Sequence, residues 1–189
     1  YQGEEIGMIN YPVETIEEVD DIESINMYNV RLSQGYAKED ILDSINAKGR
    51  DNARTPMQWN DSKNAGFTSN KPWLHINPNY PEINVEKALE EKDSLFYTYK
   101  KLIQLRHEHP IVVWGTYNLV DTEDENIFAY CRVLDEQKWL IITNFQEKTT
   151  TFDLKEEPKS VLIQNYTKKE YTKGMLYLDP YEAVVLEIS

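Results

Sequence analysis

The protein is 189 residues long, enough for one domain or two small ones, since single domains usually span ~100–200 residues. Its 33 acidic residues outnumber its 20 basic residues, and the resulting net charge of −13 at pH 7 disfavours nucleic acids and anionic membranes as partners. A hydrophobic content of 40% excludes a disordered chain, and no apolar run approaches the ~18 residues that would predict a membrane span.

Helices are predicted in the N-terminal part of the chain. Apolar residues over 15–34 recur at steps of three and shorter, which suits one or two helices that end at Gly35. Residues 38–48 place three aliphatic side chains on one face and precede Gly49, so they predict a further helix. We expect this part of the chain to be mainly helical.

Residues 50–81 show no periodicity and contain several prolines and asparagines. Loops longer than ~12–15 residues in compact domains are usually functional or disordered. Tryptophans Trp59 and Trp73 and other apolar residues give this segment material to pack. We therefore predict an ordered, functional loop.

Two more helices follow the loop. Asn84 is typical of an N-cap and predicts a short helix that ends near Glu91. Residues 95–108 carry a broad apolar stripe and end before Pro110, which predicts a longer amphipathic helix. This stripe needs a larger partner surface than residues 1–113 offer, because they contain almost no predicted strands. We therefore expect the chain to be the tail of a larger protein.

After residue 114 the periodicity changes to two. Seven short runs rich in β-branched and aromatic residues are separated by charged or Pro/Gly turns, which predicts an antiparallel β-sandwich. The predicted domains are a mostly helical part over 1–113 and a sandwich over 114–189. Alternation predicts that Tyr130, Ile141 and Val185 lie on its buried face.

Common catalytic and metal-binding motifs are absent. The chain contains no phosphate-binding Gly-rich loop and no G-x-S-x-G elbow, and His107 and His109 do not fit a zinc motif. We expect no metal and no cofactor. The single cysteine, Cys131, is interpreted as a core residue, and its being alone excludes a disulfide framework and predicts a reducing, cytoplasmic compartment.

Two segments are candidates for a binding site. Residues 1–30 contain eight acids and no Lys, Arg or His, which indicates either a solvated acidic face or an acidic wall of a polar site. Residues 50–59 place two arginines and an aspartate at the start of the aromatic, Asn-rich loop. Such residues suit a sugar site, because Arg and Asn donate to hydroxyls and Trp offers an apolar face. On chemistry alone, a structural Arg–Asp pair that holds the loop explains them slightly better.

Several segments together resemble one known family. In unbroken order they closely resemble the α-amylase family (glycoside hydrolase family 13), in its branch of oligo-1,6-glucosidases and dextran glucosidases. The resemblance covers essentially the whole chain, and its most specific block is the ten residues from Arg50. The segments that carry it are 1–8, 21–26, 50–59, 64–68, 78–80 and 83–85.

The resemblance implies an α+β fold, in which the incomplete end of a (β/α)8 barrel is followed by an antiparallel β-sandwich. Tyr1 and Gln2 would end the last barrel strand, residues 3–92 would form the final excursion from strand to helix, and residues 94–108 the last barrel helix. The sandwich would be the C-terminal domain of those enzymes. Active sites of such barrels are built from loops at the C-terminal face.

The resemblance also implies an activity, that of an intracellular retaining α-glucosidase which removes α-1,6-linked glucose from isomalto-oligosaccharides or dextran fragments. The family's three catalytic carboxylates precede the point at which this sequence begins, so we expect no catalytic residue here and an inactive isolated chain. The expected partners are an oligosaccharide substrate and the missing N-terminal barrel portion. Arg50 resembles the arginine that lines the terminal-glucose subsite. Glu23 resembles the acidic residue near the aglycone subsite. The alternative interpretation is that Glu23 is only a carboxylate on a helix surface.

Other functions remain open. Relatives of the same shape hydrolyse trehalose 6-phosphate or isomerise sucrose, although the acidic first 30 residues weigh weakly against a phosphorylated substrate. A non-catalytic glycan-binding or interaction module is a further alternative. A solvent-facing aromatic platform on the sandwich would favour it. Of the two tryptophans there, Trp114 and Trp139, we expect Trp139 to lie in the core.

Overall fold

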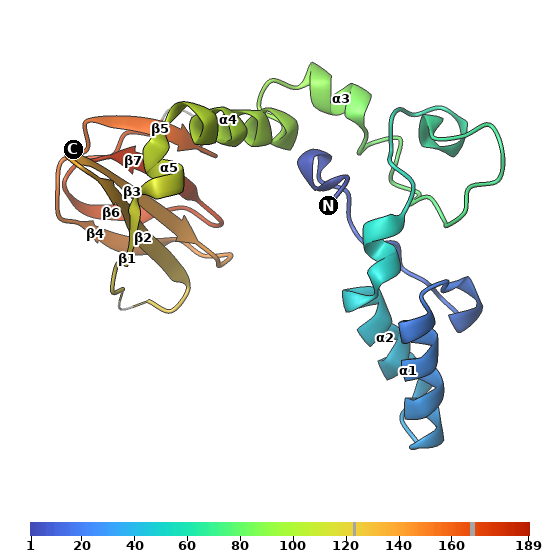
Figure 1. Cartoon of the computed structure of the whole chain (residues 1–189). Coiled ribbons are helices and arrows are strands. Elements are labelled where there is room, and N and C mark those ends of the chain that lie inside the picture. The colour runs from blue at the N-terminus through green and yellow to red at the C-terminus, as the bar shows by residue number, and fades with distance from the viewer. Residues whose placement is uncertain (123, 167–168) are drawn as a thin grey trace. The chain divides into compact units, whose positions relative to one another are not determined.

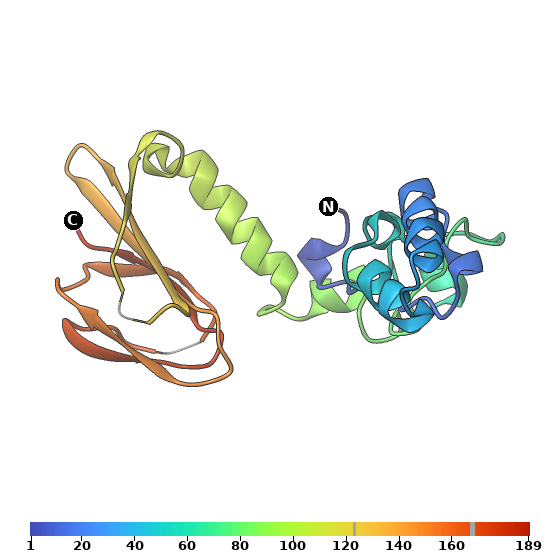
Figure 2. The ribbon, with the colours of Figure 1, turned by 90° about the horizontal axis from the view of Figure 1, so that it is seen from below.

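A computed structural model describes residues 1–122, 124–166 and 169–189. The chain divides into two compact units, Tyr1–Tyr99 and Lys100–Ser189, which can be followed by colour in Figures 1 and 2. In the part of the chain that the structure describes, no helix is long and apolar enough to cross a membrane. The predicted domain boundary after residue 113 follows from the change of periodicity and stays a prediction.

The first unit is built around two paired helices, α1 (Ile22–Ser33) and α2 (Lys38–Lys48). Val19, Tyr28, Ile41 and Ile45 form the buried core between them. Both helices were predicted, although α1 begins later than expected, because residues 16–18 form a separate 3₁₀ helix. The remaining helices of this unit are η1 (Glu4–Ile6), η2 (Ile16–Glu18), η3 (Arg50–Arg54), η4 (Lys63–Gly66) and α3 (Val85–Glu90).

The long loop is ordered by buried side-chain amides. Gln58 is fully buried, and its Nε2 donates to Asn79 Oδ1 at 3.2 Å and to the Ile83 carbonyl. Asn77 is also buried, and its Nδ2 donates to the Ile9 and Asn10 carbonyls at 3.3 and 3.0 Å. Because buried backbone and amide groups need partners, these bonds fix a segment that has no regular ladder of its own.

Inside the loop, η4 contains three consecutive residues with left-handed backbone. The φ angles of Asn64, Ala65 and Gly66 are 57°, 54° and 66°. The Ala65 carbonyl accepts from the Trp59 N–H at 2.8 Å and from the Asn60 N–H at 3.3 Å. The Asn64 side chain donates to the Thr68 and Asn70 carbonyls, both at 2.9 Å. These hydrogen bonds offset the cost of the unfavourable backbone.

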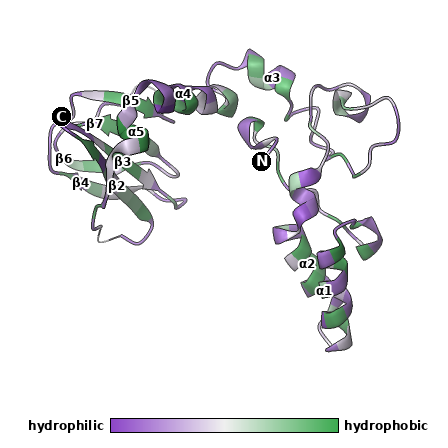
Figure 3. Ribbon diagram, viewed as in Figure 1, coloured by the Kyte–Doolittle hydropathy of each residue, from purple (hydrophilic) through white to green (hydrophobic). Residues whose placement is uncertain are grey.

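Helix α4 (Leu95–Glu108) leads from the first unit into the second. Its apolar residues are coloured green in Figure 3. Of them, Leu105 is buried, whereas Leu95, Leu102 and Ile103 are exposed by 50%, 45% and 54%. The described residues thus leave most of the predicted apolar stripe uncovered.

The second unit is an antiparallel sandwich with the seven predicted strands. A five-stranded sheet has the order β1-β2-β3-β7-β5, and β4 and β6 form a second, two-stranded sheet. Short helix α5 (Pro110–Trp114) precedes them. The core between the sheets includes Ala129, Ile142, Leu178 and Leu186. The strands are β1 (Thr116–Leu119), β2 (Ile127–Leu134), β3 (Gln137–Asn144), β4 (Thr150–Leu154), β5 (Ser160–Gln164), β6 (Gly174–Leu178) and β7 (Ala183–Glu187).

The predicted buried face of the large sheet is wrong. Tyr130, Ile141 and Val185 do share a face, since Ile141 is the cross-strand partner of both others. However, they are only half-buried, and their immediate neighbours point into the core. The reason is that α4 and α5 contribute Leu105 and Ile111 to a cluster on the outer face of the sheet. Both faces are therefore apolar, and alternation shows which residues share a face without showing which face meets the second sheet.

Two neighbouring residues on β7 test this assignment. Val184 is 1% exposed in the sandwich core, and Val185 is half-buried on the outer face. We expect Val184→Asp to destabilise the sandwich by roughly 3 kcal/mol or more, because it buries an unpaired charge. Val185→Asp should cost less than half as much, since its carboxylate can reach water. Urea unfolding of the two variants measures both values, and equal losses would contradict the face assignment.

Candidate functional site

A polar cluster forms where η3 meets the start of α1. Asp21 is the N-cap of α1 and is 4% exposed. Its Oδ2 accepts hydrogen bonds from Ser24 N–H at 3.0 Å and from Ser24 Oγ at 2.8 Å. Its Oδ1 accepts from Arg50, with Nε at 3.1 Å and Nη2 at 3.0 Å. One buried carboxylate therefore caps a helix and binds a guanidinium 29 residues away.

Arg50 also binds a second carboxylate. Its Nη2 lies 2.7 Å from Oε2 of Glu23, which is two residues after Asp21. The structure thus brings together the two residues that sequence analysis singled out. The Arg50 side chain is 53% exposed and that of Glu23 is 75% exposed. Among the described residues none accepts from Arg50 Nη1, so two of its five N–H donors are free to bind another ligand.

Asp51 and Arg54 fasten the cluster to the backbone. Asp51 Oδ2 accepts from the N–H groups of Asp20 and Asp21, both at 2.8 Å. Arg54 Nη1 lies 3.7 Å from Asp21 Oδ1 and 3.6 Å from Asp51 Oδ1. The Arg–Asp pair that was weighed as a structural alternative is therefore present. A substrate-binding role for Arg50 and Glu23 stays a prediction.

The ionised form of Asp21 is favoured. Burial alone raises the pKa of a carboxyl, but the hydrogen bonds from Ser24 and Arg50 outweigh it and hold the pKa of Asp21 below its usual value. With four donors on its two oxygens, this carboxylate has no free lone-pair direction for a proton or a substrate. Asp21 therefore serves to position Arg50.

Sequence analysis missed the role of Asp21. An Asp three residues before Ser24 at the start of a helical pattern is an N-cap signal, so its local bond could have been found. Its bond to Arg50 spans the whole of α1 and α2, and no local pattern reports such a contact.

No metal site is found in this cluster or elsewhere in the described ranges, where no three His, Cys, Asp or Glu side chains converge to hold an ion. The cluster offers two exposed charged groups of opposite sign, Arg50 and Glu23, on a rigid base. Such a pair can donate to and accept from the hydroxyls of a sugar.

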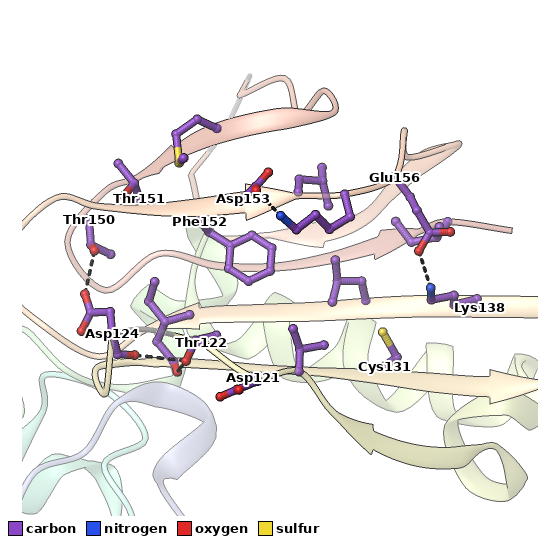
Figure 4. A pocket seen from close by; sticks show the side chains of 17 residues that line it. Asp121, Thr122, Asp124, Cys131, Lys138, Thr150, Thr151, Phe152, Asp153 and Glu156 are labelled. Atoms are coloured by element: carbon purple, nitrogen blue, oxygen red, sulfur yellow. Dashed lines mark hydrogen bonds and ion pairs between the residues drawn. The ribbon is translucent and has the colours of Figure 1, made fainter.

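The sandwich has a cleft of about 670 Å³ along β4, shown in Figure 4. Most of its charged groups are already engaged: Lys138 pairs with Glu156, and Lys155 pairs with Asp153, whereas Asp121 has no such partner among the described residues. Asp124 accepts from Thr150 Oγ1 at 2.7 Å, and this bond, with those from Asn126 and Gln146, lowers its pKa to about 2.

The Cys131 thiol also lines this cleft. It is 8% exposed, and burial raises its pKa, as suits the core residue that was predicted rather than a nucleophile. The cleft therefore holds no activated nucleophile and is structural in character.

A second groove, of about 480 Å³, runs between α4 and the outer face of the sheet. Tyr117 and Phe128 line it beside Tyr130, with ring centroids 5.1 and 5.5 Å from the Tyr130 ring. The Arg132 guanidinium in this groove donates through Nε and Nη2 to three carbonyls of α5, which fixes its position.

The two tryptophans of the sandwich do not form the platform that would favour a glycan-binding module. Trp139 is 3% exposed, as predicted for a core residue. Trp114 is 77% exposed but lies outside the groove. The aromatic surface consists of tyrosine and phenylalanine in an apolar setting, which suits a protein contact better than a sugar.

Comparison with known proteins identifies the family. A model of the α-amylase catalytic domain matches residues 1–115, and a model of the C-terminal domain of the α-amylase SusG matches residues 127–185. The chain therefore belongs to the α-amylase family, as the resemblance of its segments had implied.

Individual relatives narrow the comparison. The whole chain aligns with 34% of the oligo-1,6-glucosidase of Parageobacillus thermoglucosidasius, and the two are 49% identical over that stretch. It is 47% identical to 35% of the glucan 1,6-alpha-glucosidase of Streptococcus pneumoniae, and 42% identical to 35% of the trehalose-6-phosphate hydrolase of Bacillus subtilis. The isomaltulose synthase of Klebsiella sp. LX3 superposes with a TM-score of 0.95 and 39% identity over all of this chain and 35% of that structure. The chain thus spans about a third of the length of the curated relatives it matches.

The Asp21 carboxylate predicts an acid-sensitive stability. Because its folded-state pKa is lowered, its contribution is complete above the unfolded-state value near 3.8 and is lost as the pH falls through the folded-state value. Asp21→Asn should therefore cost about 1–2 kcal/mol at pH 7, through the loss of charge-assisted bonds, and less at pH 3. Helical circular dichroism during thermal unfolding at several pH values measures this.

Glu23→Gln is the control for that experiment. Its exposed ion pair with Arg50 should contribute less than about 1 kcal/mol. A gap between wild type and Asp21→Asn that is the same at pH 7 and pH 3 would contradict the assignment.

Proposed function

We propose that this chain is the C-terminal third of a retaining α-glucosidase that removes α-1,6-linked glucose from isomalto-oligosaccharides or dextran fragments. The observation that carries the proposal is the identity of 49% and 47%, over the whole chain, to an oligo-1,6-glucosidase and a glucan 1,6-alpha-glucosidase. Identity to the trehalose-6-phosphate hydrolase and the isomaltulose synthase is lower, at 42% and 39%.

Retaining hydrolysis requires a carboxylate nucleophile and a carboxylic acid/base ~5–5.5 Å apart. In this proposal both come from the N-terminal barrel portion that completes the relatives. The nucleophile displaces the aglycone while the acid protonates the leaving oxygen, and water then releases glucose with the same anomeric configuration. The present chain contributes a wall of the site.

Arg50 and Glu23 are the residues of that wall that contact sugar. The outward N–H groups of Arg50 donate to hydroxyls of the terminal glucose, and Glu23 accepts from a hydroxyl on the aglycone side. The 2.7 Å ion pair between them supports these two roles, because it holds both side chains next to each other on the same wall. The fixed Asp21 carboxylate orients Arg50 before substrate arrives.

The proposal includes a cytoplasmic location and a neutral oligosaccharide as the partner, with neither nucleic acid nor membrane. It is supported by the free thiol of Cys131 and by the net charge of −13.

The first test joins the chain to its proposed other part. The 189-residue chain alone should release no glucose from isomaltose, because it lacks the two catalytic carboxyl groups. A chimera with the preceding two thirds of the Parageobacillus thermoglucosidasius relative should hydrolyse isomaltose, with the α-anomer seen first by proton NMR. Trehalose 6-phosphate and sucrose are the competing substrates. Preference for either over isomaltose would refute the proposed specificity. Turnover by the purified chain alone would refute the proposal that the catalytic carboxylates lie in the N-terminal barrel portion.

The second test concerns Arg50 in the same chimera. Arg50→Lys keeps the charge but loses the planar fork that serves Asp21 and a sugar together. We expect kcat/KM on isomaltose to fall about 30- to 1,000-fold, equivalent to roughly 2–4 kcal/mol of transition-state binding. Arg54→Lys, in the same cluster, should change kcat/KM less than about threefold. If Arg50→Lys lowers the melting temperature but keeps kcat/KM, Arg50 only holds the loop.

A further inference from the structure

The first unit contains a pocket of about 400 Å³ beside the Arg50 cluster. One wall is the short segment Glu17–Asp20, and the opposite wall is Lys71–Ile76 of the long loop, with Asn64 between them. Pockets of roughly 300–1,000 Å³ are the usual size for small-molecule ligands.

Part of this lining is committed to holding the walls. Glu18 Oε1 accepts from the N–H groups of Glu14 and Thr15, both at 3.0 Å, and closes the capping box of η2. Glu18 Oε2 lies 3.6 Å from His75 Nε2, and the His75 ring stacks on Tyr11 with centroids 4.9 Å apart and an interplanar angle of 8°. These contacts join the two walls across the pocket.

Other lining groups are available. In the described part of the chain, the carboxylates of Glu17 and Asp20 and the ammonium of Lys71 have no hydrogen-bond or ion-pair partner within contact distance. The Trp73 side chain lines the same pocket and is 66% exposed. The pocket therefore presents an uncovered aromatic ring together with free acceptors and a free donor.

This combination matches the chemistry of a pyranose. The C–H face of a sugar ring covers an indole, while its hydroxyls donate to carboxylates and accept from an ammonium. A purely apolar ligand would leave three charged groups desolvated without partners. A phosphorylated sugar would meet two carboxylates against one ammonium.

We propose that this pocket is a second sugar-binding site, which holds a neutral glucosyl unit against Trp73. The choice of an α-1,6-linked glucan as its ligand rests on the proposed function. Its position supports this choice, because Asp20 lines the pocket and the adjacent Asp21 holds Arg50. Asp51 Oδ2 binds the N–H groups of both residues, so the pocket and the Arg50 cluster share one fixed segment of backbone.

The four tryptophans of the chain provide the test. In a ¹⁵N-labelled sample of the 189-residue chain each indole N–H gives one cross-peak, and Trp73→Phe assigns that of Trp73. Titration with isomaltotriose should shift the Trp73 peak saturably at millimolar concentration and leave those of Trp114 and Trp139 in place. Trp73→Ala should weaken binding, followed by saturation transfer to the sugar protons, by about tenfold. Trp114→Ala should leave it unchanged.

Further variants separate the possible outcomes. Glu17→Gln keeps an oxygen acceptor and should weaken isomaltotriose binding only about threefold, and trehalose 6-phosphate should bind more weakly than trehalose. A stationary Trp73 peak, or equal affinity in wild type and Trp73→Ala, would overturn the proposal. Neither result bears on hydrolysis of isomaltose by the chimera, so this proposal and the proposed function can fail independently.

Discussion

The buried carboxylate of Asp21 is the contact on which the polar half of the first unit depends. It accepts from the Ser24 N–H and hydroxyl in the first turn of α1 and from the guanidinium of Arg50 at the same time. The Asp51 side chain of η3 in turn accepts from the backbone N–H groups of Asp20 and Asp21, so it ties the segment just before α1 to η3. If either carboxylate were lost, buried donors would remain without acceptors, and such a deficit costs more than the hydrogen bond itself contributes. The start of the loop of about 30 residues is thus held at fixed acceptors while Arg50 stays half-exposed.

The second unit follows a different principle. Its large sheet is apolar on both faces, with β4 and β6 on one side and the apolar residues of α4 and α5 on the other. Arg132 reaches from β2 to three carbonyls at the C-terminal end of α5 and so satisfies groups that a helix of five residues cannot pair itself. The sheet thus fixes α5.

Periodicity predicted most of the elements, although it missed the short helix α5 and the 3₁₀ helices. The helical periodicity placed α1, α2 and α4, and the strand periodicity placed all seven strands. The predicted N-cap Asn84 does accept from the Lys87 N–H, at 2.9 Å. The face of the large sheet could not be predicted in this way, because Val184 and Val185 are equally apolar and only the tertiary arrangement separates them.

The same limit applies to the candidate site. Arg50 and Glu23 were identified through the resemblance of their segments to a family, whereas chemistry alone slightly favoured a structural pair. Asp21, the residue that holds Arg50, was passed over, since Arg50 lies two helices further along the chain. The pocket at Trp73 depends on which carboxylates are already hydrogen-bonded, and that information exists only in the folded state.

The left-handed turn at 64–66 restricts how this region can vary in sequence. Asn tolerates such a backbone better than most residues, and glycine is free of the restriction. Ala65 is fully buried, so only a hydrogen or a methyl group fits there. A side chain at Gly66 would place its Cβ 2.6 Å from Asn60 Oδ1. Few tripeptides meet all three conditions, so the backbone itself selects Asn-Ala-Gly at this turn, and the rim of the Trp73 pocket should drift more slowly in evolution than the exposed side chains it supports.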